Sequence, residues 1–155
     1  MRTIEELVAE VGALQALAPE HRDTIAGCAR NRVCEPGEHI MREGDPADAF
    51  FLVRRGTVAV ETTVPGRGAT TVETLHDGDV LGWSWLVPPY RDAFDARALG
   101  IVHLLELDAA CLRGRCERDP RLGYALLRLL ALVFAERLTD ARLRLLDLYG
   151  TVPAE

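Results

Sequence analysis

The sequence predicts an α+β protein, with helices at both ends of the chain and a compact β-unit between them. Three observations support this fold class. Apolar side chains recur at helical spacing in residues 1–29, glycines separate short apolar stretches in residues 30–107, and helical spacing returns in residues 108–149. Residues 150–155 are expected to form a tail. A chain of 155 residues, 48% of them hydrophobic, can bury a core as one domain without metals or disulfides.

The N-terminal part is expected to contain two helices. Thr3 and Glu6 have the spacing of a capping box, and apolar residues at helical spacing extend the first helix over residues 4–17. Pro19 is expected to begin a second, shorter helix, because proline is tolerated in the first helical turn. This second helix runs toward Gly27.

The β-unit is expected to consist of adjacent strands joined by tight turns. The expected strands are residues 51–53, 57–60 and 70–75, and the turns are residues 54–56, 65–68 and 76–79. Residues 65–68 contain one proline and two glycines, so they are the expected tip of a hairpin. After a break at residues 83–92, residues 96–107 supply the last strands, and Asp108 is expected to cap a short helix.

A long helix is expected over residues 119–149, with Gly150 as its stop signal. One set of its apolar residues repeats at steps of three and four, like the seam of a coiled coil: Ala131, Phe134, Leu138, Ala141, Leu145 and Leu148. Other apolar residues form a second face: Leu126, Leu129, Leu132, Val133, Leu143 and Leu146. Because one small β-unit cannot easily cover both faces, we expect a homodimer joined through this helix. The alternative is that the helix packs only on its own domain.

Several motifs occur in order along the β-unit. They are Pro36-Gly37-Glu38, Glu43-Gly44-Asp45-Pro46-Ala47-Asp48, Phe51-Leu52-Val53, Gly56, and Gly78-Asp79-Val80-Leu81-Gly82. Together they resemble the signature of the cyclic nucleotide-binding domain of Crp/Fnr-type regulators, over about residues 18 to 149. The resemblance implies a β-roll, that is, a double-stranded β-helix of the jelly-roll type, flanked by N-terminal helices and a long C-terminal helix.

The segment over residues 82–98 differs from the family's phosphate-binding segment. The resemblance implies a turn glycine, matched by Gly82, and then a glutamate that binds the ribose, but Trp83 follows instead. It also implies an arginine for the cyclic phosphate. In that register Asp92 takes the arginine's place, and Arg91 lies one residue earlier. We therefore expect cyclic AMP to bind weakly or not at all.

The expected ligand is a nucleotide or another small anion, and no cofactor is assigned. It would lie against the backbone N–H groups of Gly82, Trp83 and Ser84, with Arg91 as the first-choice cation and Arg97 as the second. A ring of Trp83 could stack on a planar ligand. In the alternative interpretation, one or both tryptophans of this segment fill the pocket as core residues.

Three functions remain open from the sequence. The favoured one is a stand-alone regulatory sensor domain with an altered ligand pocket, which signals to a protein partner. The alternatives are a dimeric adaptor whose pocket is filled by its own tryptophans, and a thiol-based redox sensor. The net charge of -6 argues against non-specific nucleic-acid binding. The DNA-binding members of the family carry a helix-turn-helix domain after their long helix, whereas only residues 151–155 follow here, so we expect no DNA binding by this chain itself.

The protein is expected to be cytoplasmic, without a membrane span, because the N-terminus resembles no targeting segment and the apolar runs are short. Cys28, Cys34, Cys111 and Cys116 lack the spacing of metal motifs, so we expect free thiols, no disulfide and no metal. The four histidines are isolated, and Gly82-Trp83-Ser84-Trp85-Leu86 lacks the second glycine of a hydrolase nucleophile elbow. We therefore expect no enzymatic activity.

Overall fold

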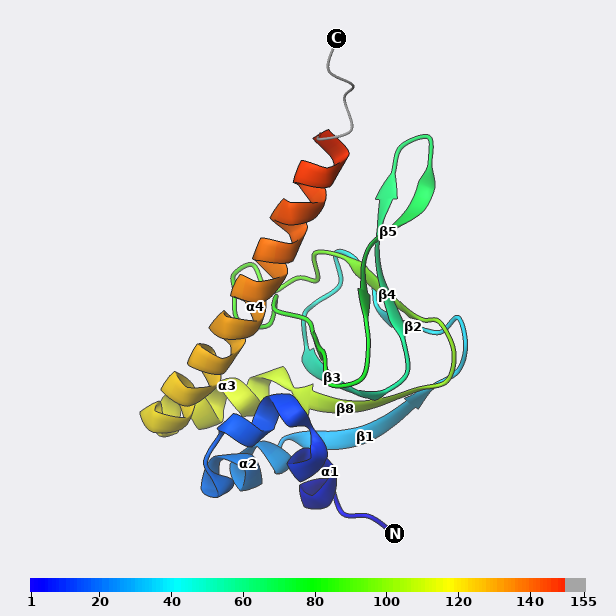
Figure 1. Ribbon diagram of the computed structural model, residues 1–155. Helices are drawn as coiled ribbons and strands as arrows, with labels where there is room; N and C mark the ends of the chain where they lie inside the picture. The colour runs from blue at the N-terminus through cyan, green and yellow to red at the C-terminus, as the bar shows by residue number, and fades with distance from the viewer. Residues whose placement is uncertain (150–155) are drawn as a thin grey trace.

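The computed structural model describes residues 1–149, in which two four-stranded antiparallel sheets are flanked by helices from both ends of the chain (Figure 1). This arrangement confirms the predicted α+β class. The predicted helix stop at Gly150 lies outside the described residues. None of the described helices is both long and apolar enough to cross a membrane.

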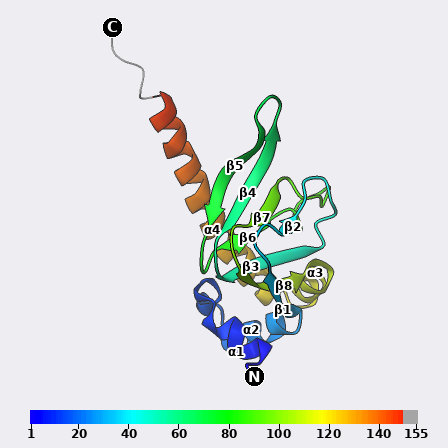
Figure 2. The same cartoon turned by 90° about the vertical axis from the view of Figure 1, so that its right-hand side faces the viewer.

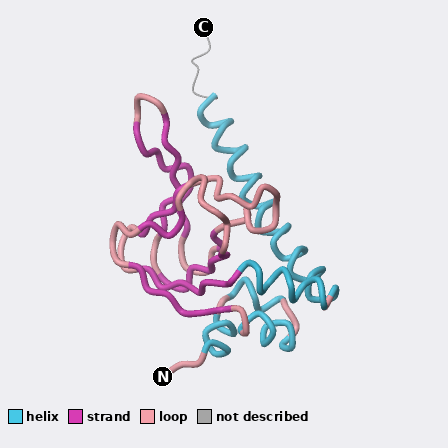
Figure 3. The backbone as a smooth tube through the Cα atoms, turned by 180° about the vertical axis from the view of Figure 1, so that it is seen from behind, coloured by secondary structure: helices cyan, strands magenta, loops and turns pink. Residues whose placement is uncertain are grey.

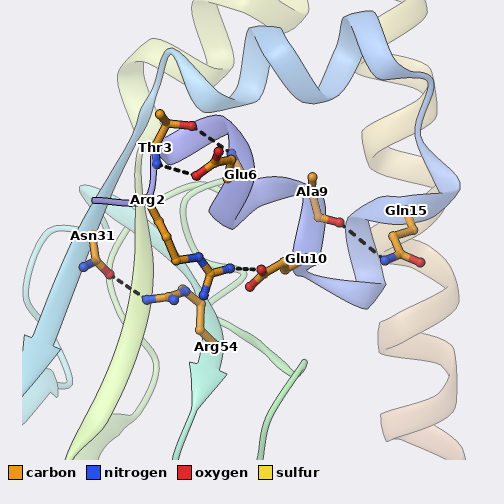
Figure 4. Close-up of polar contacts among 8 residues, drawn as sticks. All are labelled: Arg2, Thr3, Glu6, Ala9, Glu10, Gln15, Asn31 and Arg54. Atoms are coloured by element: carbon orange, nitrogen blue, oxygen red, sulfur yellow. Dashed lines mark hydrogen bonds and ion pairs between the residues drawn. The ribbon is translucent and has the colours of Figure 1, made fainter.

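The N-terminal helices are α1 (Ile4–Glu10), the 3-10 helix η1 (Gly12–Ala16) and α2 (Pro19–Ala26). The capping box is confirmed: Thr3 N donates to Glu6 Oε2 at 2.9 Å, and Glu6 N donates to Thr3 Oγ1 at 3.2 Å (Figure 4). The prediction of one helix over residues 4–17 was wrong, because Val11 is extended and separates α1 from η1. Gly12 favours such a break, since glycine is a poor helix former.

The strands fall into two sheets. They are β1 (Ala29–Cys34), β2 (His39–Met41), β3 (Ala49–Arg55), β4 (Val58–Val64), β5 (Gly68–Leu75), β6 (Val80–Leu81), β7 (Asp95–Ala98) and β8 (Val102–Asp108). One sheet has the order β1-β8-β3-β6 and the other β2-β7-β4-β5. The β4–β5 hairpin is confirmed, with its turn at residues 65–67 and Gly68 already paired with Val64 as the first residue of β5.

The segment 54–56 carries the chain from one sheet to the other. β3 and β4 were expected to be adjacent strands, but β3 pairs with β6 and β8, whereas β4 pairs with β5 and β7. Gly56 makes this crossing feasible, because its φ is +114° and an added Cβ would lie 2.8 Å from the carbonyl oxygen of Ile101. Local sequence patterns identify a turn here, but they do not reveal which sheet the next strand joins.

The core has two layers, and β3 and β8 contribute to both. Phe51 and Leu104 pack between the two sheets, whereas Leu52 and Leu105 pack against the helices. Successive side chains of a strand point to opposite faces, so a strand buried on both sides is apolar over most of its length. The apolar runs in these two strands follow from that requirement.

The C-terminal helices are α3 (Ala109–Arg118) and α4 (Pro120–Tyr149). The predicted cap is confirmed, since Asp108 Oδ1 accepts a hydrogen bond from Cys111 N at 2.7 Å. Leu122, Leu126 and Leu130 bury the first half of α4 in the helical core. The second half runs beside the β4–β5 hairpin (Figure 2).

Cys28 and Cys111 form a disulfide, although they are 83 residues apart in the sequence. The prediction of four free thiols and no disulfide was therefore wrong. Pairing of β1 with β8 aligns Ala29 with Leu107, which brings the end of α2 to the start of α3 and leaves the two Cα atoms 5.7 Å apart. Cys34 and Cys116 are free thiols.

Candidate functional site

A cavity of about 650 Å³ lies between the sheet that contains β4 and β5, the segment after β6, and the second half of α4. Figure 3 shows this segment as a loop between the strands and α4. The cavity is lined by apolar and aromatic side chains, two arginines, one glutamate and one serine. The lining includes Gly82, Trp83, Ser84, Phe94, Phe134, Leu138, Arg137, Arg144 and Glu73.

Three residues predicted from the sequence line this cavity, namely Gly82, Trp83 and Ser84. Gly82 has a φ of +95°, a conformation that residues with a Cβ resist, so glycine is required where β6 turns into the segment. Trp83 is 40% exposed, whereas Ser84 is buried. The indole of Trp83 therefore remains accessible to a ligand.

Trp85 anchors the same segment to the helical core. It is only 1% exposed, and its ring lies 5.4 Å from that of Phe50. Its carbonyl oxygen accepts a hydrogen bond from Arg113 Nη1 at 2.7 Å. Trp85 is thus a core residue, as the alternative interpretation allowed for one tryptophan, but it does not line the cavity. The space between the sheet and α4 stays open.

The cations of the cavity, Arg137 and Arg144, come from α4. Arg137 Nε lies 3.5 Å from Glu73 Oε1, and Arg137 Nη2 donates to the carbonyl oxygen of Val80. Arg144 Nη1 donates to the carbonyl oxygen of Val72 at 3.3 Å. Sequence reasoning missed both residues. The available signal was their seven-residue separation, two helical turns, which places both arginines on one face of α4.

The two arginines predicted from the sequence lie elsewhere. Arg91 is exposed, and its Nη1 donates to the carbonyl oxygen of Gly44 at 3.0 Å. Arg97 forms an ion pair with the buried carboxylate of Glu61, and this contact raises the pKa of Arg97. Neither arginine is part of the cavity lining.

Asp92 was expected beside the phosphate position, but it lines a smaller cavity of about 270 Å³ together with Asp45 and Asp48. Burial, and then the two neighbouring carboxylates, raise the pKa of Asp92 to about 6. Because Asp92 lines this smaller cavity, its carboxylate does not face the larger one. Within residues 1–149, no group of three or more His, Cys, Asp or Glu side chains is arranged to hold a metal ion.

Comparison with known sequences finds related regulatory proteins. A family model described as the cyclic nucleotide-binding domain matches residues 31–119. The cAMP-dependent protein kinase regulatory subunit of Dictyostelium discoideum is 32% identical over 107 residues, which are 67% of this chain and 33% of that protein. Cyclic nucleotide-gated ion channel 18 of Arabidopsis thaliana is 33% identical over 75% of this chain and 18% of its own length. The chain thus spans a third or less of these two relatives.

Comparison with solved structures finds the same fold. A cyclic nucleotide-binding domain from Methylobacillus flagellatus superimposes with a TM-score of 0.79 at 20% identity, covering 97% of this chain and 84% of that one. The catabolite activator protein of Thermus thermophilus has a TM-score of 0.68 at 29% identity, covering 89% and 62% of the two chains. The two sheets and the long C-terminal helix therefore have counterparts in proteins of known structure.

Proposed function

The chain belongs to the cyclic nucleotide-binding domain family, and from this membership we propose that it is a regulatory sensor domain for a small anionic ligand. The ligand binds in the 650 Å³ cavity between the β-roll (β1 to β8) and α4. The observation that carries this proposal is the combination of two arginines with aromatic side chains around one open cavity. A volume of this size suits a nucleotide-sized molecule.

The lining supports a ligand with a planar group and a negative charge. Trp83, Phe94 and Phe134 supply aromatic surfaces on which a planar group can stack. Arg137 and Arg144 supply guanidinium groups, which bind phosphate or carboxylate through charge-assisted hydrogen bonds. The anion lies toward Gly82, Trp83 and Ser84 in this proposal, with the α4 arginines replacing Arg91 and Arg97 as its cations.

Cyclic AMP is not the favoured ligand. By resemblance to the family, the residue after Gly82 should be a glutamate for the ribose hydroxyl, and here it is Trp83. Glu73, which also lines the cavity, lies against Arg137. Loss of one hydrogen bond to a charged group weakens binding by roughly ten- to a hundredfold, so cyclic AMP should bind poorly.

A homodimer through α4 is part of the proposal. On the second apolar face of the helix, Leu132, Leu143 and Leu146 are more than half exposed. Two leucines of the predicted seam, Leu138 and Leu145, are also more than half exposed in the single chain. Their burial against a second copy would remove apolar surface from water. Leu138 also lines the cavity, so ligand and dimer share an element. The acidic net charge favours a protein over DNA as the molecule to which this domain signals.

A redox sensor is a second candidate, because the structure pairs Cys28 with Cys111. This disulfide joins the end of α2 to the first turn of α3, so reduction would release a link between the N-terminal and C-terminal helices. The ligand cavity contains no cysteine, which makes the two candidate functions separable by experiment.

Isothermal titration calorimetry with cyclic and linear nucleotides tests the sensor proposal. We expect one linear or modified nucleotide to bind more tightly than cyclic AMP, and Arg137→Gln to weaken that binding by about tenfold or more. Arg142→Gln is the matched control, because Arg142 is exposed on the same helix and does not line the cavity. Sub-micromolar binding of cyclic AMP would contradict the ligand assignment. If Arg91→Ala abolished binding and Arg137→Gln did not, Arg91 would be the cation that binds the ligand, as the sequence predicted.

A further inference from the structure

A second large cavity, of about 600 Å³, lies where α1 and the start of η1 meet the end of β3. The ionisable residues of its lining are Arg2, Arg54, Arg55, His103, Glu10 and Asp77. No residue of this lining belongs to the cavity of the proposed function. The two cavities are therefore separate sites, and a ligand in this one would not require a ligand in the other.

The two carboxylates of this cavity already have partners. Glu10 forms an ion pair with Arg2 (Figure 4). Asp77 Oδ1 accepts a hydrogen bond from Gly56 N at 2.8 Å, which holds the crossing between the two sheets. Both acidic groups are thus committed to the fold, and neither lies within ion-pair distance of Arg54 or Arg55.

Among the described residues, the basic side chains of this cavity have fewer hydrogen-bond and ion-pair partners than its carboxylates. Arg54 donates to the neutral amide oxygen of Asn31 at 3.0 Å, as Figure 4 shows. Within residues 1–149, no hydrogen bond or ion pair engages the side chain of Arg55 or of His103. The guanidinium groups of Arg2, Arg54 and Arg55 outnumber the two carboxylates in a protein whose net charge is negative. The cavity lining therefore carries an excess of one positive charge, three guanidinium groups minus two carboxylates.

The surroundings of Arg54 disfavour its positive charge. Burial, together with the neighbouring charges of Arg2 and Arg55, lowers the pKa of Arg54. A partly desolvated cation beside like charges gains stability from a bound anion, because the anion supplies the missing charge and hydrogen bonds. Arginine is also well suited to phosphate, which it binds with two parallel N–H donors.

We propose that this cavity binds a phosphorylated small molecule, with the phosphate on Arg54 and Arg55. The cavity is larger than a phosphate ion requires, and its wall includes the apolar side chains of Leu7 and Val11. These residues face the organic part of the ligand. Binding ties α1 to the end of β3, because the ligand contacts residues of both segments.

The experiment compares two probes, inorganic phosphate and phenyl phosphate, by calorimetry and by amide chemical shifts. We expect both to bind and to shift the amides of Gly12 and Gly78, with phenyl phosphate binding more tightly because of its apolar ring. Arg55→Gln is the decisive variant, since Arg55 is exposed and its loss removes no hydrogen bond within the described residues. It should weaken both probes by about tenfold or more.

Arg137→Gln is the control, because Arg137 belongs to the other cavity. Unchanged binding to Arg55→Gln, or absence of binding to the wild type at millimolar concentrations, would overturn this site. Loss of binding in Arg137→Gln alone would place the phosphate in the larger cavity. That result would refute the present proposal and leave the sensor proposal standing. Equal affinity for the two probes would refute the role of Leu7 and Val11.

Discussion

The guanidinium of Arg97 and the carboxylate of Glu61 meet at two points, with Nε 2.9 Å from Oε1 and Nη2 3.1 Å from Oε2. The two residues belong to the paired strands β7 and β4. Parallel hydrogen bonds of this kind are among the stronger polar contacts in proteins. Arg97, a candidate ligand cation by sequence, is thus committed to holding two strands of the sheet together.

Replacement of Glu61 by glutamine should lower the melting temperature by several degrees, because Arg97 loses its charged partner. The hydrogen bonds and charge of Arg97 hold the pKa of Glu61 below its ordinary value. The stabilisation is therefore fully present above the ordinary carboxyl pKa and is lost as the pH falls through the lowered pKa. Thermal unfolding at neutral and at acidic pH measures this difference, which should disappear in strong acid. Glu35→Gln, at an exposed carboxylate, is the control and should change little.

Replacement of Asp92 by asparagine should stabilise the protein at neutral pH, by roughly 1 kcal/mol or more. The pKa of Asp92 is about 6, above its ordinary 3.8, because of burial and then of Asp45 and Asp48. The folded state therefore holds a proton that the unfolded chain releases, and stability falls as the pH rises from about 4 to about 6. Urea unfolding at several pH values in this range measures the free energy of unfolding. In the variant this free energy should change less with pH than in the wild type. If the variant kept the same pH dependence of its unfolding free energy, a group other than Asp92 would be the one that titrates in this range.

Removal of the disulfide by a double Cys28→Ser, Cys111→Ser substitution should cost about 2–4 kcal/mol, since the bond closes a loop of 83 residues in the unfolded chain. Denaturant unfolding measures the loss, and dithiothreitol should produce a similar loss in the wild type. Cys116→Ser is the control, because Cys116 is a free thiol. Alkylation of the unreduced, unfolded protein should label Cys34 and Cys116 alone. Labelling of all four cysteines would contradict the disulfide.

Replacement of both Leu138 and Leu145 by glutamate should produce monomers, because charges buried in an apolar seam cannot be paired. Both leucines are more than half exposed in the single chain, so the variant should still fold. Light scattering measures the mass. Leu99→Glu, at an exposed leucine between β7 and β8, is the control and should leave the mass unchanged. A dimer that survives the double substitution would exclude this seam as the interface.

Much of the fold could be predicted because its signals are local. Helix starts are marked by residues that suit the first turn, namely the capping box at Thr3, the proline at position 19 and the aspartate at position 108. Turns are marked by glycines, which adopt the positive φ angles that turns require. The motifs around these turns were also sufficient to identify the family. The break in the first helix was missed although Gly12 is a local signal for it, because the apolar spacing continues across the break. The switch of sheet at Gly56 was missed because it depends on where the chain packs afterward.

The amino-acid sequence alone determined the α+β class with helices at both ends of a β-unit, the turn at Gly82 and the absence of the expected glutamate after it. Only the tertiary structure decided which arginines line the larger cavity. Arg97 is held by Glu61 across the sheet, Arg91 lies outside the larger cavity, and Arg137 enters it from α4. The pairing of Cys28 with Cys111 likewise required β1 to lie beside β8. The physical reason is that backbone conformation follows from neighbouring residues, whereas the partners of a charge or thiol follow from packing between distant segments.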